Sequence, residues 1–113
     1  MTPVSNVRRL RRPLELAEDA AAELADLFRL LGDASRLKVV AACLAGPCSV
    51  SEIAERADLS VSLASHHLRL LRAARIVRAA RQGRQVFYEA QDEHVRRVIE
   101  DMMAHVGEPR EED

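Results

Sequence analysis

The fold is decided by residues 49–89, SVSEIAERADLSVSLASHHLRLLRAARIVRAARQGRQVFYE. The first part predicts a short helix that ends at Ala57, and the residues Asp58-Leu59-Ser60 then predict a turn. From Ser60 to about Ala74 apolar residues recur at spacings of one, three and four, which is typical of an amphipathic helix. The stretch therefore predicts two helices joined by a tight turn.

Serines mark the start of both predicted helices. The pattern Ser49-Val-Ser-Glu52 is a capping box, in which Ser49 caps the helix and Glu52 stands at the third helical position. Ser51 is the alternative cap for the same helix. Ser60 is expected to open the second helix.

The period changes after the second helix. Residues 76–80 and 85–89 are short runs of β-type residues, and they flank Arg81-Gln-Gly-Arg84, whose glycine favours a tight hairpin turn. Two helices followed by a two-stranded hairpin predict a winged helix-turn-helix, which is mainly α with a small β-hairpin.

Three further helices are expected around this unit. Apolar spacing predicts helices over 14–31 and 34–45, separated by Gly32 and Asp33, and a last helix over 92–106 with Asp92 as its cap. The predicted organisation is a basic N-terminal arm at residues 1–13, one domain over 14–108 and an acidic tail at 109–113.

Length and composition exclude several classes of protein. A chain of 113 residues is one domain and is too short for a (β/α)₈ barrel, which needs about 250 residues. No apolar run approaches the ~20 residues of a membrane-spanning helix, and the N-terminus lacks the apolar region of a signal peptide. Two cysteines do not make a disulfide framework, so we expect a cytoplasmic protein with no membrane partner.

Charge is strongly segregated along a chain whose formal net charge is −1. Residues 60–88 hold six arginines and no acid, which favours contact with a polyanion, the alternative being a solvated face balanced by acids elsewhere. The N-terminal half of the second helix is expected in the major groove of double-stranded DNA, with the hairpin on the flanking backbone or in the minor groove. The predicted DNA-binding residues are Ser60, Ser62, Ser65, His66, Arg69 and Arg72 on the helix, and Arg81, Gln82, Arg84 and Gln85 on the hairpin.

The serines and His67 of the second helix have simpler interpretations than contact with DNA. A serine at a helix start can act as an N-cap or a surface hydroxyl, which applies to Ser60 above all. His67 is interpreted as packing against the neighbouring helix rather than as a DNA contact.

The last helix carries a pattern of metal-ligand residues. His94 and His105 are eleven residues apart, close to three helical turns, so they share one face of the helix. Asp92 lies beside His94, and Glu108 follows His105 by three positions. The simpler interpretation is that Asp92 is only a helix cap and the histidines are surface or interface residues.

One chain cannot bring both histidines to one metal ion. The helical rise of ~1.5 Å per residue separates them by about 16 Å, whereas Zn–N distances are about 2.0–2.1 Å. Two last helices packed antiparallel in a two-fold homodimer would bring Asp92 and His94 of one chain against His105 and Glu108 of the other. Two identical sites per dimer follow.

The donor set indicates the metal and argues against catalysis. Two nitrogen and two oxygen ligands in a closed tetrahedral set favour Zn²⁺, with Co²⁺ as a close mimic, while Ni²⁺ prefers more ligands or a planar arrangement. A metallohydrolase needs an open coordination position for water, and four protein ligands leave none. The chain is therefore not expected to be an enzyme.

From about Leu24 to Glu108 the sequence resembles the ArsR/SmtB family of metal-responsive repressors. The resemblance rests on residues 31–38 (LGDASRLK), 65–71 (SHHLRLL) and 81–88 (RQGRQVFY), and on the D-x-H-x₁₀-H-x₂-E pattern. It implies a homodimer that represses transcription when metal-free and releases its operator when zinc binds, so that genes for metal export or sequestration are expressed. It also implies that the first and last helices form the dimer interface.

The sequence departs from its cadmium- and lead-sensing relatives at one place. Those relatives carry Cys-x-Cys at the start of the third helix, where this chain has Ser49-Val-Ser51, with Cys48 one residue earlier. Cys43 and Cys48 are interpreted as small buried thiols. The alternative is a repressor of the same fold induced by Co²⁺ or Ni²⁺, or by thiol chemistry at these two cysteines.

Overall fold

The structure, a computed structural model, describes residues 14–110, and the arm at 1–13 and the last three residues of the tail lie outside this range. Within it the chain forms five helices and a three-stranded sheet, which confirms the predicted winged helix-turn-helix class. The elements in chain order are α2 (Glu18–Leu31), α3 (Ala34–Ala42), β1 (Cys48–Ser49), α4 (Val50–Ala57), α5 (Val61–Ala73), β2 (Val77–Gln82), β3 (Gln85–Ala90) and α6 (Glu93–Gly107).

Helices α4 and α5 form the predicted helix-turn-helix with the predicted caps. Ser49 accepts the N–H of Glu52 and the Glu52 carboxylate accepts the N–H of Ser49, so the capping box is complete. Asp58 ends α4 in the left-handed region, at φ 57°, a conformation that Asp tolerates better than most residues. Ser60 caps α5 by accepting the N–H of Leu63.

The wing is built on one more strand than the sequence predicts. Strands β2 and β3 pair antiparallel from Val77↔Ala90 to Gln82↔Gln85, and Gly83 begins the two-residue loop at φ 64°. The predicted hairpin is confirmed, and a third strand that the sequence analysis did not predict joins it, because β1 pairs with β3 through Cys48↔Tyr88 and Ser49↔Phe87. Strand β1 was not predicted because two residues are too few to show the alternation of apolar and polar residues that marks a strand. Its partner, β3, lies far along the chain.

Two helix boundaries also differ from the predicted ones. Helix α2 begins at Glu18 rather than at residue 14, and Leu14 and Leu16 remain exposed. Ala17 stands at its N-cap and has no side-chain acceptor for the first N–H groups. The acidic residues of the first turn, Glu18 and Asp19, stabilise the helix start through the helix dipole. Helix α3 ends at Ala42, before the predicted residue 45.

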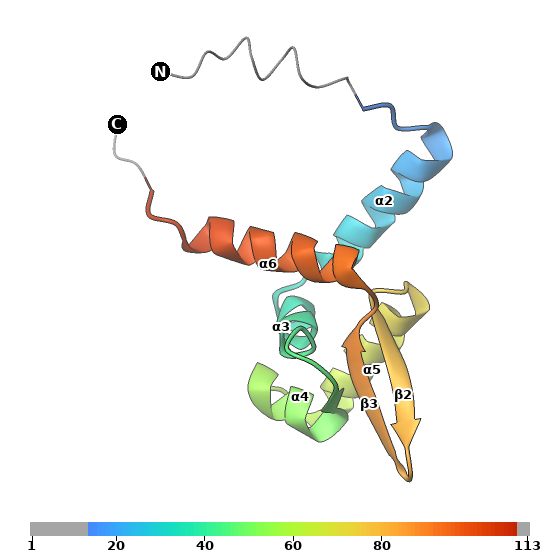
Figure 1. Ribbon diagram of the computed structural model, residues 1–113, viewed down its shortest axis with the longest axis vertical. Coiled ribbons are helices and arrows are strands. Elements are labelled where there is room, and N and C mark those ends of the chain that lie inside the picture. The colour runs from blue at the N-terminus through green and yellow to red at the C-terminus, as the bar shows by residue number, and fades with distance from the viewer. Residues whose placement is uncertain (1–13, 111–113) are drawn as a thin grey trace.

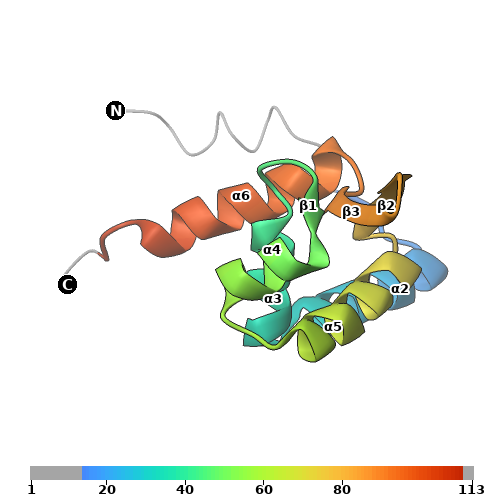
Figure 2. The same cartoon turned by 90° about the horizontal axis from the view of Figure 1, so that it is seen from below.

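The core lies between α3, α4, α5 and the sheet. Its fully buried side chains are Val39, Val40, Cys43, Ile53, Leu68, Leu71 and Val77. Figure 1 shows α6 crossing above α3 and α4, with the hairpin loop at the lower end of the molecule, and Figure 2 shows α6 along one side of the other helices. In α6 the buried residue is Ile99, so residues 14–110 leave most of this helix uncovered. Among residues 14–110, no helix is long and apolar enough to cross a membrane.

Candidate nucleic-acid interface and metal centre

Helix α5 divides its residues between the core and the solvent. Ala64, His67, Leu68 and Leu71 are buried, which orients the other side of the helix outward. The six DNA-binding residues predicted on this helix are all on the outward side, half-buried at Ser65 and exposed at the rest: Ser60, Ser62, Ser65, His66, Arg69 and Arg72. The Ser60 hydroxyl accepts the N–H of Leu63 at 3.0 Å, so its simpler interpretation as an N-cap is confirmed.

The wing carries its polar residues at the end of the hairpin. Gln82 and Gln85 pair across the strands on either side of the loop, and Arg81, Gln82, Arg84 and Gln85 are all exposed there. Arg78, nearer the base, is held by Glu89 at 3.1 Å across the strands. This leaves the arginines nearest the loop as the candidates for backbone contact.

A polar hollow joins α5 to the wing. Ser65, Arg69 and Arg72 of α5 line it together with Tyr88 of β3. Sequence reasoning had placed the first three at DNA and had left Tyr88 out. The phenol is a hydrogen-bond donor at the junction of α5 and the wing, and sequence reasoning missed it because only Gln85 of strand β3 was predicted at DNA.

His67 is 4% exposed, which confirms that it packs inside the domain. Its ring lies between two residues of α3: Nε2 is 2.8 Å from Ser35 Oγ, and Nδ1 accepts from Arg36 Nε at 3.3 Å. Asp33, the N-cap of α3, accepts from the Ser35 hydroxyl at 2.7 Å and from the N–H of Arg36. Sequence reasoning missed the roles of Ser35 and Arg36, although both belong to the 31–38 motif.

The environment shifts the pKa of two groups in this cluster. Hydrogen bonds from the Arg36 N–H and the Ser35 hydroxyl lower the pKa of Asp33. Burial, followed by the nearby Arg36 guanidinium, lowers the pKa of His67. Asp33 is therefore kept ionised and His67 neutral at physiological pH.

Helix α6 presents the four predicted metal ligands as two pairs. Oδ1 of Asp92 lies 3.8 Å from Nδ1 of His94 at the start of the helix. Oε1 of Glu108 lies 3.9 Å from Nδ1 of His105 at its end. The helix runs to Gly107, so Glu108 is its C-cap and stays within reach of His105.

Each pair supplies half of a tetrahedral donor set. Within residues 14–110, one chain does not gather three or more His, Cys, Asp or Glu side chains into a metal-holding group. Each pair offers one imidazole and one carboxylate, and all four side chains are at least half exposed. Two pairs from two chains would provide the two nitrogen and two oxygen ligands that suit zinc.

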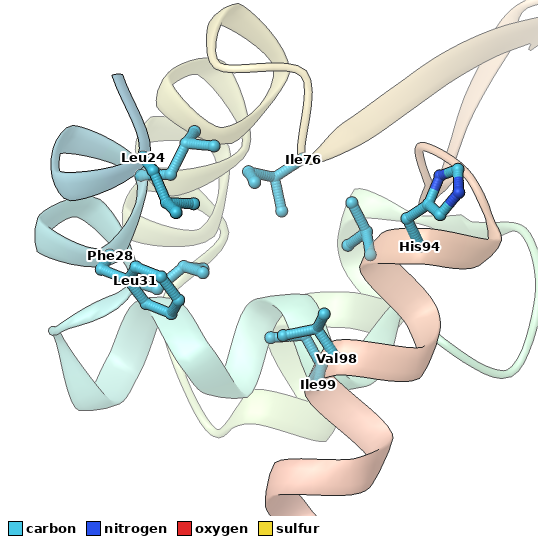
Figure 3. Close-up of a pocket in the computed structure, with 9 residues that line it drawn as sticks. Leu24, Phe28, Leu31, Ile76, His94, Val98 and Ile99 are labelled. Carbon is cyan, nitrogen blue, oxygen red and sulfur yellow. The ribbon is translucent and has the colours of Figure 1, made fainter. Parts of the chain in front are cut away.

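An apolar groove separates α2 from α6. Figure 3 shows Leu24, Phe28 and Leu31 of α2 on one side and Val98 and Ile99 of α6 on the other. His94 stands at its edge on the first turn of α6. A second apolar hollow lies along the rest of α6, and its lining includes Leu37, Met102, Met103 and Val106.

Both cysteines are buried, as their simpler interpretation predicted. Burial and the neighbouring Cys48 raise the pKa of the Cys43 thiol to about 12, which leaves it without reactive thiolate at neutral pH. The sulfur of Cys48 lies 3.3 Å from the Ala42 carbonyl oxygen and accepts from Arg56 at 2.8 Å.

Comparison with known proteins agrees with this architecture. Residues 33–79 match the family model described as "Bacterial regulatory protein, arsR family". The HTH-type transcriptional regulator KmtR of Mycobacterium tuberculosis is 37% identical over 89 residues, which are 79% of this chain and 68% of that protein. The "Transcriptional repressor SmtB homolog" of Synechocystis sp. is 32% identical over 108 residues, which are 94% of this chain and 82% of that protein.

A solved structure supports the same assignment. The AntR antimony-specific transcriptional repressor superposes with a TM-score of 0.73 at 27% identity, covering 87% of this chain and 89% of that one. The chain therefore belongs to the ArsR family of bacterial regulatory proteins, and it is a winged helix-turn-helix transcriptional regulator, not an enzyme.

Proposed function

We propose that the protein is a metal-responsive repressor whose metal-free homodimer binds operator DNA and whose binding of Zn²⁺ at the α6 helices releases it. Derepression of genes for metal export or sequestration would follow. The observation that carries the proposal is the pairing of ligands at both ends of an exposed helix, in a chain that also presents a basic helix and wing. The relative from Synechocystis is named a transcriptional repressor, and AntR is an antimony-specific one.

The dimer is inferred from apolar surface on the two outer helices. Phe28 on α2 is 58% exposed, and Met102 and Met103 on α6 are 55% and 54% exposed. Exposed apolar side chains gathered on two neighbouring helices indicate a protein contact. A two-fold axis across α6 sets the Asp92–His94 pair of one copy against the His105–Glu108 pair of the other.

The donor chemistry favours zinc over the alternatives. Co²⁺ fits the same tetrahedral set, whereas Ni²⁺ would need further ligands. The other two histidines belong to α5: His67 is buried against α3, and His66 is exposed on the side of the helix that we assign to DNA. The raised pKa of Cys43 argues against thiol chemistry as the inducing event.

Release of the operator is explained by the geometry of two recognition helices. The half-sites of an operator lie about 34–36 Å apart, so both α5 helices must hold a fixed separation to bind together. Metal shared between the two α6 helices would fix one subunit relative to the other. Each domain rests on its α6 through Ile99, so a change at α6 alters the separation of the α5 helices.

Fluorescence anisotropy tests this proposal. A labelled duplex from the region upstream of the protein's own gene is titrated with metal-free protein, and again with one Zn²⁺ per protomer. Tight, salt-dependent binding that zinc weakens is expected, and His94→Gln should bind equally well but no longer respond. Tight binding that is indifferent to zinc would overturn the metal assignment, with Co²⁺, Ni²⁺ and thiol oxidants as the next additions.

A further inference from the structure

Hydrogen bonds tie the recognition helix to α3 and to the end of α2, and the proposed function makes no use of them. The ring of His67 on α5 contacts Ser35 Oγ at 2.8 Å and Arg36 Nε at 3.3 Å. Ser35 donates onward to Asp33 at 2.7 Å, and the Arg36 guanidinium donates to the Leu30 carbonyl oxygen at 2.8 Å. This series of hydrogen bonds joins the 31–38 motif to the 65–71 motif.

The direction of each hydrogen bond follows from its donors. Ser35 has one hydroxyl hydrogen, which goes to the Asp33 carboxylate, so Ser35 Oγ must accept from His67 Nε2–H. Arg36 Nε can only donate, so His67 Nδ1 must be the unprotonated acceptor. The arrangement therefore requires the neutral ring with its hydrogen on Nε2.

A proton added to His67 would break this arrangement. It would place an N–H on Nδ1 directly opposite the N–H of Arg36, with a positive charge on each group. The charged and titratable groups around the ring are Arg36 and Asp33 from α3 and His66 from α5 itself. Asp33 favours the charged ring, but it reaches His67 only through Ser35, whereas Arg36 touches it directly.

The remaining buried contacts of α5 are less directional. Ala64, Leu68 and Leu71 pack through apolar surface, which resists separation but only weakly fixes rotation. The hydrogen bonds of His67 therefore add a directional constraint on how α5 is turned about its axis. The neighbouring residues Ser65 and His66, half-buried and exposed, are among those that the proposed function places at DNA.

We propose that Ser35 and Arg36 are positioning residues, which hold neutral His67 so that α5 is set for the operator, and that protonation of His67 releases this hold and weakens operator binding. The inference rests on the proposed function, because it needs an operator. Under this inference, protonation of His67 lowers operator affinity. Protonation of an exposed histidine at DNA would instead raise the affinity, because the added charge attracts the phosphates.

The first experiment follows the ring itself in metal-free protein. Long-range ¹H–¹⁵N NMR spectra should show His67 as the Nε2–H tautomer with a pKa below the ordinary 6.5. Arg36→Gln should raise that pKa, since it removes the guanidinium that opposes the proton. Arg29→Gln, which removes an exposed charge at the end of α2 without touching His67, should leave it unchanged. An Nδ1–H tautomer, or no change in Arg36→Gln, would overturn the proposal.

The second experiment measures operator affinity by anisotropy between about pH 5.5 and 8, with the same upstream duplex and no metal. Affinity of the unaltered protein should fall about tenfold on acidification, the size expected for a lost charge-assisted hydrogen bond. His67→Gln keeps a donor and an acceptor but cannot take a proton, so the fall should disappear. Arg36→Gln should move its midpoint to higher pH.

The outcomes separate this inference from the proposed function. Acid weakening that persists in His67→Gln, or an Arg36→Gln variant that binds less well at every pH without a change of midpoint, would contradict the positioning role. Circular dichroism of each variant checks that the fold is retained. If the unaltered protein failed to bind the duplex at any pH, the proposed function would fall, while the NMR result would still decide whether Ser35 and Arg36 hold the ring.

Discussion

Oδ1 of Asp92 lies 3.8 Å from Nδ1 of His94 and at the same time accepts the N–H of Val95 at 3.0 Å. One carboxylate thus caps α6 and stands beside a side chain that we propose as a metal ligand. The helix cap uses Oδ1, which leaves the second carboxylate oxygen available to a metal ion. The simpler interpretation of Asp92 as a cap and its interpretation as a ligand are therefore compatible.

Two substitutions at Asp92 separate these roles. Asp92→Asn keeps a capping oxygen and should change the free energy of unfolding by only a few tenths of a kcal/mol, whereas Asp92→Ala should cost about 1 kcal/mol. Both remove the ligand charge, so both should bind zinc more weakly. Thermal unfolding and a zinc titration against a chelator measure the two effects. Unchanged zinc affinity in Asp92→Asn would show that Asp92 only caps the helix.

Mixed dimers test whether each metal site is shared between subunits. The variants His94→Gln and His105→Gln each spoil both sites of their own homodimer. In a heterodimer of the two, one site loses both histidines and the other keeps both, so mixing should restore one high-affinity zinc site per heterodimer.

The measurement is zinc stoichiometry before and after the two variants exchange subunits, with His94→Gln alone as the control. Random exchange makes about half of the dimers heterodimers, so antiparallel sharing predicts about one zinc per heterodimer, or one zinc for every two dimers in the mixture. If mixing restored nothing, the two pairs would not meet across the dimer.

Phe28 tests the dimer surface. Phe28→Asp places a charge on the apolar face that α2 shares with α6 and should shift the protein toward monomer. Ala22→Asp is the matched control, because Ala22 is exposed on the opposite side of the same helix. Sedimentation velocity over a concentration series measures both. Equal dimerisation of the two variants would place the interface elsewhere.

Arg84 tests contact between the wing and the DNA backbone. Arg84→Gln should weaken binding to all sequences alike and reduce the slope of log K against log salt concentration by about 0.9, the effect of one lost phosphate contact. Arg29→Gln removes an equal charge far from the wing and should leave the slope unchanged. A normal slope in Arg84→Gln would mean that the wing does not touch the phosphates.

Most of the fold could be predicted from local pattern. Caps and apolar spacing are properties of a few consecutive residues, so Ser49, Ser60 and Asp92 are each found at the helix start that the sequence predicts. The hairpin was equally predictable, because Gly83 supplies the positive φ that its two-residue loop requires.

Contacts between distant segments could not be predicted in this way. Strand β1 is two residues long and is defined only by its pairing with Phe87 and Tyr88. The bonds from Ser35 and Arg36 to His67 likewise join residues far apart in sequence, and nothing local to either motif indicates the other. The two His–carboxylate pairs at the ends of α6 were predictable from short sequence spacing, because Asp92 and Glu108 cap the helix two and three residues from their histidines.

The central claim, that zinc and operator compete through the dimer, is tested most directly by measuring zinc affinity with and without the duplex. Thermodynamic linkage requires that DNA weaken zinc binding by the same factor by which zinc weakens DNA binding. Isothermal titration of zinc into the free protein and into the saturated complex should give that same factor. Equal zinc affinity in the two titrations would contradict the account.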